Sequence, residues 1–485
     1  MISFDNTYSR LPELFYARVA PAKAPKPELI KWNIELARQL GAPLESLTDN
    51  ELGEIFTGQK LLPGSEPIAL AYAGHQFGHF VPQLGDGRAL LLGEVLDPSG
   101  RRYDIQLKGS GRTPFSRLGD GKAPLGPVLR EYLVSEALHT LGLPTTRALA
   151  AAKTGELVYR DKAFPGAMLT RVASSHLRIG TFEYFAARQD MENLEILTQY
   201  AIKRHYPEIQ NDSEAYLQFF RKVGHAQVEL VTSWMAVGFI HGVMNTDNMS
   251  IAGEAIDFGP CAFMDQFRFN QVFSSIDQFG RYSYANQAQI TLWNLSRLAN
   301  CLILLSNHGS KEEIEMYKKE LDFFGNLFDQ RLTFKMRKKL GIFDDEQPQD
   351  RDLIRKWLLY LEAQQLDYTL SFRNLANLLT NDADSDFFEQ TGEFQDFQPL
   401  WRKRIQLQDL EPRHIREQMN RVNPVFIPRN HKIEQVIESA LTGDFSLFHE
   451  MNKVLKKPYA EQKRFNSYKS APGPEQVVHA TFCGT

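Results

Sequence analysis

A polar segment in the middle of the chain carries residue types that can bind a divalent metal ion. Residues His241 to Asn248 read His-Gly-Val-Met-Asn-Thr-Asp-Asn, and Asp257 to Gly259 read Asp-Phe-Gly. Carboxylate and amide oxygens are the hard ligands that Mg²⁺ prefers. Asn248 and Asp257 are therefore candidate metal ligands, whereas an Asp-Phe-Gly on its own would more often be a surface turn.

The spacing of this segment matches the one that protein kinases use to hold metal ions against ATP phosphates, except at one position. In a kinase, an Asp two residues after the His accepts the proton of the substrate hydroxyl. This chain has Val243 at that position. Asp247 lies on the same loop and could remove the proton instead, or it could serve only the structure of the turn.

Glycines and a lysine upstream of this segment could bind phosphate groups. Gly85-Asp86-Gly87-Arg88 precedes a strand pattern, and Lys108 ends the next one. Glycine lets backbone amides approach a phosphate closely, and lysine supplies a compact positive charge. Each signal is weak alone, because Gly-Asp-Gly is usually a turn. Glu131 on the following helix is the candidate ion-pair partner of Lys108, and Glu136 is a rival.

Further candidates for phosphate binding lie on either side of this helix. Gly119-Asp120-Gly121-Lys122 forms a second glycine turn before it, and Arg171 and Arg178 come after it. Arginines can bind phosphate through two parallel hydrogen bonds, although surface arginines are more often solvated or paired with carboxylates.

Two kinds of hydrophobic pattern surround these residues. Short apolar runs among glycines predict strands and amphipathic stretches predict helices. The predicted strands are Ala89 to Val95, Tyr103 to Leu107, Leu157 to Tyr159 and Ala167 to Thr170, with a hairpin of Met249 to Ala252 and Ala255 to Phe258 about Gly253. The predicted helices are Leu29 to Leu40, Pro127 to Leu141, Leu194 to His205, Glu214 to Val237, Ala285 to Leu305, Asp352 to Gln364 and Tyr368 to Leu379.

This order of elements predicts an α+β, protein-kinase-like fold with two lobes. Residues 1–68 would be an N-terminal extension, residues 69–190 a strand-rich N-lobe, and residues 191–468 a mainly helical C-lobe that carries the catalytic and metal-binding loop. Residues 469–485 would be a flexible tail, since Ser470 to Gln476 combines small, polar and proline residues.

The composition is that of a globular protein, with 43% hydrophobic and 24% charged residues. A net charge of -4 gives no general attraction to nucleic acid or to an anionic membrane. The basic run Lys335 to Lys339 is predicted to be a solvated helix face, not a nucleic-acid site. No apolar run approaches the roughly 20 residues of a membrane span, and no signal-peptide core is visible, so a cytoplasmic location is expected.

Several longer motifs, taken together, resemble the selenoprotein O family, a pseudokinase-like family of protein adenylyltransferases. The resemblance covers nearly the whole chain. The motifs that carry it are Phe4-Asp5-Asn6-Thr7-Tyr8, Ala73-Gly74-His75-Gln76-Phe77-Gly78, Gln106-Leu107-Lys108-Gly109-Ser110-Gly111, Arg130-Glu131-Tyr132, His241 to Asn248 and Asp257-Phe258-Gly259-Pro260.

The resemblance implies a kinase fold that binds ATP in a reversed orientation and transfers AMP to Ser, Thr or Tyr hydroxyls of proteins. It implies Mg²⁺ as the metal, with Mn²⁺ as the alternative, held by Asn248 and Asp257. Asp247 would accept the proton. The residues that would hold the nucleotide are Gly85, Gly87, Arg88, Lys108, Asp120, Gly121, Arg171 and Arg178.

Three functions remain open at this point: an adenylyltransferase, an ordinary phosphotransferase and a non-catalytic nucleotide-binding module. The absence of an acid at Val243 disfavours the phosphotransferase. The presence of Asp247, Asn248 and Asp257 disfavours the module.

The cysteines suggest a further hypothesis. Cys261, Cys301 and Cys483 are too few and too far apart for a disulfide framework or a zinc site. Cys483 replaces the selenocysteine of the resembled family, and Cys261 follows the Asp-Phe-Gly motif. A regulatory disulfide between Cys261 and Cys483 is one prediction, and a buried Cys261 with an idle terminal thiol is the alternative.

Overall fold

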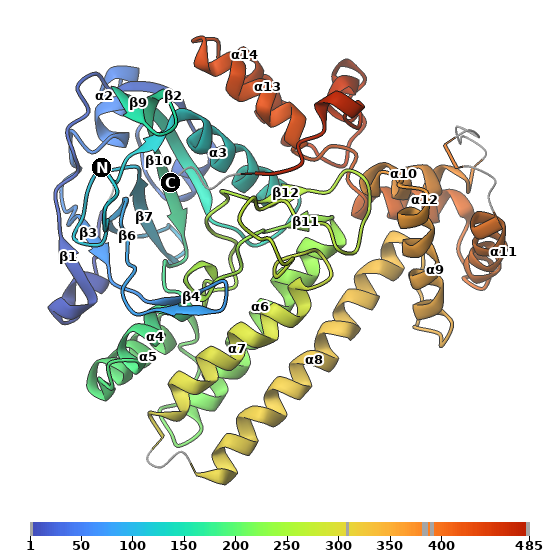
Figure 1. Cartoon of the computed structure of the whole chain (residues 1–485), viewed down its shortest axis with the longest axis horizontal. Coiled ribbons are helices and arrows are strands. Elements are labelled where there is room, and N and C mark those ends of the chain that lie inside the picture. Colours follow the sequence, from blue (N-terminus) through green and yellow to red (C-terminus); the bar gives the residue numbers. More distant parts are fainter. Residues whose placement is uncertain (1–2, 307–309, 381–386, 389–391, 482–485) are drawn as a thin grey trace.

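The computed structural model describes residues 3–306, 310–380, 387–388 and 392–481, and it is a mixed α/β structure (Figure 1). The main β-sheet lies within the first 173 residues, and helices dominate after them. No helix in these ranges combines the length and apolar content that crossing a bilayer requires.

The main sheet has eight strands, and its paired strands are antiparallel. Apart from the hairpin about Gly253, the predicted strands lie within it. Their apolar residues are mostly buried, except that Leu157 and Tyr159 at the end of β9 are exposed. The strand order is β1 (Tyr16–Arg18), β3 (Ile68–Leu70), β6 (Ala89–Leu96), β7 (Arg102–Lys108), β10 (Ala163–Ala173), β9 (Arg147–Tyr159) and β2 (Glu28–Trp32), and β8 (Ala123–Pro124) pairs with β10.

The N-terminal segment contributes to this sheet directly. β1 pairs with β3, and β2 pairs with β9. The helix predicted over Leu29 to Leu40 is therefore wrong in its first half, where β2 lies, and α1 spans only Ile34–Gln39. Asn33 separates the two elements, because its side chain accepts a hydrogen bond from the Leu36 amide and caps the helix.

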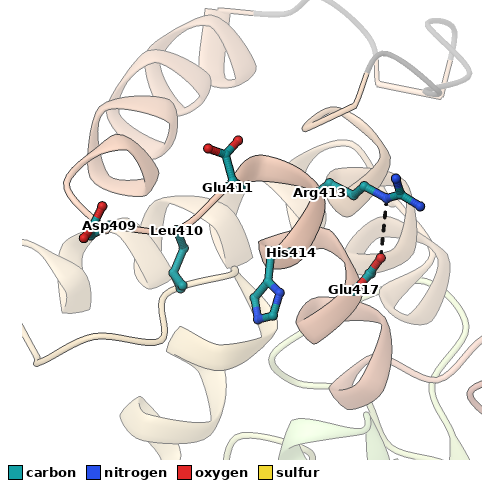
Figure 2. A pocket seen from close by; sticks show the side chains of 6 residues that line it. All are labelled: Asp409, Leu410, Glu411, Arg413, His414 and Glu417. Carbon is teal, nitrogen blue, oxygen red and sulfur yellow. Dashed lines mark ion pairs between the residues drawn. The ribbon is translucent and has the colours of Figure 1, made fainter.

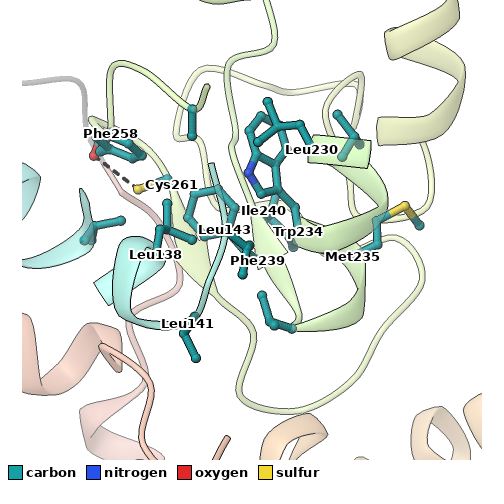
Figure 3. Packing of buried hydrophobic residues seen from close by; sticks show 14 of the residues in the cluster. Leu138, Leu141, Leu143, Leu230, Trp234, Met235, Phe239, Ile240, Phe258 and Cys261 are labelled. Atoms are coloured by element: carbon teal, nitrogen blue, oxygen red, sulfur yellow. Dashed lines mark hydrogen bonds between the residues drawn. The ribbon is translucent and has the colours of Figure 1, made fainter. Parts of the chain in front are cut away.

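Helix α3 (Leu125–Thr140) packs against β9 and β10, close to the predicted range. Helices α13 (Asn430–Leu441) and α14 (Ser446–Leu455) pack against α3 in turn. A buried cluster joins α3 to the rest of the molecule, and Figure 3 shows Leu138 of α3 near Phe258 and Cys261. The sheet, α3 and the segment after Asp257 therefore share one core.

The other predicted helices are all present, with boundaries that shift by a few residues. Between them lies a long helix, α8, that the patterns did not predict as a unit. The remaining helices are α2 (Asp49–Phe56), α4 (Ile179–Ala186), α5 (Met191–His205), α6 (Ala215–Ala236), α7 (Gln287–Ile303), α8 (Lys311–Lys339), α9 (Asp350–Ala363), α10 (Tyr368–Asn377), α11 (Gly392–Gln406) and α12 (Pro412–Val422).

The predicted hairpin about Gly253 is not formed. Ser250 forms a β-bridge with Arg178, and Ala255 forms one with Thr145. Short two-stranded pairs occur instead between β11 (Phe239–Ile240) and β12 (Ala262–Phe263) and between β4 (Gly74–Gln76) and β5 (His79–Val81). Pairing with distant segments replaces local pairing here. It attaches residues 241–259, the polar loop, to the sheet side of the molecule.

The end of the described chain is attached next to the Asp-Phe-Gly segment. The Thr481 hydroxyl donates a hydrogen bond of 2.6 Å to the Pro260 carbonyl, and the Thr481 amide donates one of 2.7 Å to the Phe273 carbonyl. A short 3₁₀ turn, η5 (Pro474–Gln476), precedes this contact.

The basic run Lys335 to Lys339 is not a solvated face, contrary to the sequence-based expectation. Arg337 and Lys339 are both buried, Arg337 against Asp350 and Lys339 beneath the ring of Phe372. The Lys339 ammonium donates to Asn423 Oδ1 at 2.8 Å. Burial lowers the pKa of Lys339 to about 7, because a charged ammonium loses its hydration there.

Replacing Lys339 with Met should flatten the pH dependence of stability. The unfolded chain keeps the ordinary, higher lysine pKa, so it binds more protons than the folded chain between these two pKa values. Lys339 therefore makes the free energy of unfolding rise with pH above about 7, by at most about 1.4 kcal/mol per pH unit. Urea unfolding of both proteins between about pH 7 and 10 checks this. Lys319→Met, at an exposed site on α8, should leave the slope unchanged.

Candidate functional site

A cavity of about 690 Å³ brings the predicted site residues together. It lies where β6, β7 and β10 meet α3 and the polar loop. Every residue predicted to contact nucleotide or metal lines it, together with the predicted ion-pair partner Glu131. These residues are Gly85, Gly87, Arg88, Lys108, Asp120, Gly121, Glu131, Arg171, Arg178, Asp247, Asn248 and Asp257.

Lys108 occupies the centre of the sheet side of this cavity. It ends β7 and lies opposite Ala89 of β6 and Leu169 of β10. Its ammonium contacts Glu131 Oε2 at 2.6 Å, and Glu131 projects from α3. The rival Glu136 instead pairs with Arg147 at 2.8 Å, so Glu131 is the partner of Lys108.

Asp257 receives the charges of three cations. Its carboxylate lies 2.5 Å from Lys108 Nζ, 3.0 Å from Arg171 Nη2 and 3.3 Å from Arg178 Nη1. Burial alone would raise the pKa of Asp257, but these positive charges outweigh burial and hold its pKa well below the usual range. Asp257 is therefore a carboxylate anion.

The two arginines have spare hydrogen-bonding capacity. Among the described residues, Nε and Nη1 of Arg171 and Nε of Arg178 are buried without a hydrogen-bond partner. A buried donor without a partner is costly, because it has lost its hydrogen bonds to water. Phosphate oxygens entering the cavity could accept from such donors.

Arg178 is held in place by groups that the sequence did not reveal. Asp86 Oδ1 lies 3.6 Å from Arg178 Nη2, and Gln106 Nε2 donates to Asp86 Oδ2 at 3.0 Å. The Arg178 guanidinium also lies 4.4 Å from the ring centroid of Tyr72. Asp86 was visible only as the middle residue of a Gly-Asp-Gly turn, and no local pattern indicated that its side chain would turn inward.

Asp247 lies on a 3₁₀ turn, η3 (Thr246–Asn248), at the cavity wall. Its carboxylate is buried, and Oδ1 has no hydrogen-bond partner among the described residues. Burial raises the pKa of Asp247 to about 6. A carboxylate with one free oxygen and a raised pKa is suited to accept a proton.

The candidate metal ligands fit a divalent ion whose remaining ligands come from a bound nucleotide and water. Asn248 and Asp257 both line the cavity. The Asn248 amide nitrogen donates to the Val243 carbonyl at 3.0 Å, which leaves its side-chain oxygen available. Within the described ranges, no cluster of three or more His, Cys, Asp or Glu residues could hold a metal alone. One or two protein ligands completed by phosphate oxygens and water is how Mg²⁺ commonly binds.

The glycine turn Gly119 to Lys122 lines the cavity and is held by the β9–β10 hairpin, which was not predicted to contribute. Asp120 pairs with Arg160, which follows β9, at 2.9 Å and 3.0 Å. Gly121 has a φ of 70°, and a Cβ there would lie 2.1 Å from the Gly111 carbonyl oxygen. The glycine is therefore required to close this turn, whatever its role toward a ligand.

The β4–β5 hairpin positions the polar loop, and sequence reasoning assigned it no role. Gln76 Nε2 donates to Asp247 Oδ2 at 3.4 Å, the Phe77 amide donates to Asn245 Oδ1 at 3.0 Å, and the His75 amide donates to the Thr246 hydroxyl at 2.7 Å. The motif Ala73 to Gly78 indicated only the family resemblance. Its role in positioning the loop was not predictable, because the residues it contacts are far away in the sequence.

Replacing Gly74 with Ala should slow catalysis without unfolding the protein. A Cβ at Gly74 would lie 2.6 Å from Asp247 Oδ1, so the carboxylate must move. We expect kcat to fall by about 10²-fold if Asp247 is the base, with little change in the thermal midpoint. Gly325→Ala is the matched control, because a Cβ there meets only ordinary contact at 3.7 Å. Equal rates for both variants would contradict the role of this close approach.

Cys261 lies outside the lining of the cavity and is fully buried. Its thiol donates to the Phe258 carbonyl at 3.3 Å, and burial raises its pKa to about 12. Cys483, its predicted partner, falls outside the described residues.

A second cavity, of about 470 Å³, lies at the start of α12 (Figure 2). None of the predicted site residues that the structure describes line it. The residues around it are Asp409, Leu410, Glu411, Arg413, His414 and Glu417, and Arg413 pairs with Glu417 at 3.5 Å.

Comparison with known proteins gives matches over nearly the whole chain. Residues 1–456 match the family model described as "Protein adenylyltransferase SelO". Relatives named "Protein nucleotidyltransferase YdiU" include those of Rhizobium meliloti, 50% identical over 99% of both chains, and of Rhodopseudomonas palustris, 52% identical over 99% of both chains. That of Nitrobacter hamburgensis is 51% identical over 100% of this chain and 96% of its own. The chain belongs to the protein adenylyltransferase SelO family.

Proposed function

We propose that the chain transfers AMP from ATP to Ser, Thr or Tyr hydroxyls of proteins, on a two-lobed, protein-kinase-like scaffold. Membership of the family supports nucleotidyl transfer. The observation that carries the proposal is the convergence of Lys108, Arg171 and Arg178 on Asp257 in a cavity that Asp247 also lines. A strand-rich part up to about residue 190 and a helical part after it would be the two lobes.

The inner cations favour a nucleotide bound with its terminal phosphates inward. Lys108, Arg171 and Arg178 would neutralise the β- and γ-phosphates, and the α-phosphate would then face the acceptor. Asp247 would take the proton of the acceptor hydroxyl, whose oxygen forms a bond to the α-phosphorus as the bond to the β-phosphate bridge breaks. Pyrophosphate leaves toward the inner cations. Mg²⁺, or Mn²⁺ as the alternative, held by Asn248 and Asp257 would neutralise phosphate charge.

Two competing functions lead to different products. A phosphotransferase would move the γ-phosphate, and a non-catalytic module would move neither group. Val243 stands where a kinase has its base, which disfavours the first. Oδ1 of Asp247 lies at the cavity wall with no hydrogen-bond partner in the described part of the chain. This disfavours the second, because a binding module has no need of a buried base.

Labelled ATP distinguishes the three functions. The protein would be incubated with a protein extract, Mg²⁺ or Mn²⁺, and ATP labelled at either the α- or the γ-phosphate. We expect protein-bound label from the α-phosphate only. Label from the γ-phosphate only would establish a kinase, and label from neither would favour the module.

The disulfide between Cys261 and Cys483 remains a proposal. Thr481 contacts Pro260, so the described end of the chain lies next to Cys261. Because Cys261 is buried with a raised pKa, the segment must open before its thiolate can react. Peptide mapping after mild oxidation, with activity measured before and after reduction, would test the link. Activity that ignores both reduction and Cys483→Ala would refute it.

A further inference from the structure

The mouth of the larger cavity carries apolar side chains that face solvent. Leu118 is 100% exposed, Ile276 is 60% exposed and Phe279 is 95% exposed. Leu118 and Ile276 line the cavity from two separate loops, and Phe279 follows Ile276 on the second loop. Exposing large apolar groups to water is unfavourable, and grouped exposure beside a binding cavity marks a surface that another molecule covers.

The loop that carries Ile276 and Phe279 is firmly held, so their exposure is not a result of fraying. The buried Asp277 carboxylate accepts hydrogen bonds from the Arg281 amide at 2.9 Å and from the Tyr282 amide at 2.8 Å. The Tyr282 hydroxyl donates to Asn245 Oδ1 on the polar loop at 2.5 Å. The two apolar side chains are thus presented at a fixed position relative to Asp247, and a preordered surface loses little entropy on binding.

The loop that carries Leu118 is tied to the phosphate side of the cavity. The Thr113 hydroxyl donates to the Asp86 carbonyl at 2.8 Å, and the Gly119 amide donates to the Ser116 carbonyl at 2.8 Å. Arg117 adopts a φ of 53°, which turns the chain sharply just before Leu118. Leu118 therefore projects from a turn anchored beside Gly85 and Gly87.

Positive charge accompanies these apolar side chains. In the part of the chain that the structure describes, Arg117 and Arg281 form no ion pair with a carboxylate. The Arg281 guanidinium lies 4.6 Å from the ring centroid of Trp293. Asp277 is the acidic residue of the second loop, and its carboxylate accepts hydrogen bonds from backbone amides. Arg117 lines the cavity and Arg281 lies two residues after Phe279, whereas the Asp120 carboxylate is paired with Arg160. The mouth is therefore apolar with an excess of positive charge, and it complements a segment that is apolar and acidic.

We propose that Leu118, Ile276 and Phe279 form the docking surface for the acceptor segment of the protein substrate. The segment would place an apolar side chain beside the hydroxyl to be modified and would carry acidic residues nearby. This inference rests on the proposed function, since it names the class of sequence that delivers the hydroxyl to Asp247. In the proposed orientation the phosphates bind the inner cations, and both the adenosine and the acceptor would extend toward the mouth. The exposed apolar side chains there are assigned to the acceptor, and separate KM values for peptide and for ATP distinguish the two.

The test measures AMP transfer to a peptide library with a central Ser, Thr or Tyr. We expect the wild type to prefer peptides with Phe or Leu beside the acceptor and Glu nearby. Ile276→Ser and Phe279→Ser should each lower kcat/KM for these peptides by about tenfold, the effect of losing one interface anchor. The loss should appear in KM for peptide, KM for ATP should stay constant, and the preference for Phe over Ser should shrink.

Leu407→Ser is the matched control. Leu407 is 61% exposed, close to the exposure of Ile276, and it lies after α11, away from the cavity lining. This variant should behave as the wild type does. Leu118→Ser should lower peptide affinity in the same way as the other two changes, which would place the acceptor between the two loops.

Several outcomes would overturn the docking surface. Wild-type rates in Ile276→Ser and Phe279→Ser, or a rise in KM for ATP in place of KM for peptide, would show that these side chains do not bind the acceptor. Loss of self-association or of binding to anionic vesicles in Phe279→Ser, with peptide kinetics unchanged, would assign the surface to another partner. α-Label on proteins but not on library peptides would exclude a short acceptor segment. Absence of α-label from every acceptor would instead refute the proposed function, and the docking surface with it.

Discussion

Replacing Asp257 with Asn should abolish AMP transfer while preserving, or tightening, the binding of ATP without metal. The carboxylate is a candidate metal ligand and also lies within 3.3 Å of Lys108, Arg171 and Arg178. Loss of metal-ion stabilisation is expected to cost several kcal/mol, so kcat should fall by about 10³-fold or more. The neutral amide leaves three cations with less compensation, and the triphosphate can supply the missing negative charge.

Two measurements separate these effects. Single-turnover transfer of α-label would report catalysis, and calorimetry with ATP and a chelator would report metal-free binding. Asp322→Asn, which makes the same chemical change at an exposed position of α8, is the control. An Asp257→Asn protein that transfers AMP within tenfold of the wild-type rate would show that Asp257 does not hold the essential metal. Weaker metal-free binding would contradict the electrostatic argument.

Replacing Asp247 with Ala should slow transfer without weakening nucleotide binding. A general base typically contributes about 10²- to 10⁴-fold to the rate. The side chain of Asp247 pairs with none of the three inner cations, and Arg178 contacts only its main-chain carbonyl, at 2.8 Å. The alanine variant keeps that carbonyl, so the phosphate-binding cations should stay in place.

Kinetics at saturating ATP, together with the dissociation constant for ATP, would test this role. A near-normal kcat in Asp247→Ala would refute Asp247 as the base. The companion variant Val243→Asp restores an acid at the kinase position, yet it should not create a kinase, because the inner cations would still hold the terminal phosphates inward. Gain of γ-phosphate transfer would contradict the proposed orientation.

The elements around the site show where local patterns are informative. The strands β6 and β7 and the helix α3 were predictable, because alternating or helical apolar spacing is a property of neighbouring residues. The hairpin about Gly253 was predicted wrongly, because its two segments had better partners in Thr145 and Arg178. The helix over Leu29 to Leu40 failed for a similar reason, since β2 gains a strand partner in β9.

The sequence alone determined which chemical groups the site contains. Asn248, Asp257 and Asp247 were recognisable from residue type and spacing, and Lys108 from its place at the end of a strand pattern. The family of the chain could be inferred because several motifs that carry the resemblance are long. Residue types, their spacing and the motifs are properties of residues close together in the chain. They can therefore be recognised without knowledge of the tertiary packing.

Only the tertiary structure decided how these groups act on one another. Glu131 and not Glu136 pairs with Lys108, and Gln76 reaches Asp247 across 171 positions of sequence. Burial also raised the pKa of Asp247 and lowered that of Lys339, although nothing local distinguishes either residue from a solvated one. Contacts, burial and pKa values depend on the surroundings that distant segments create on folding, and for that reason a local pattern does not contain them.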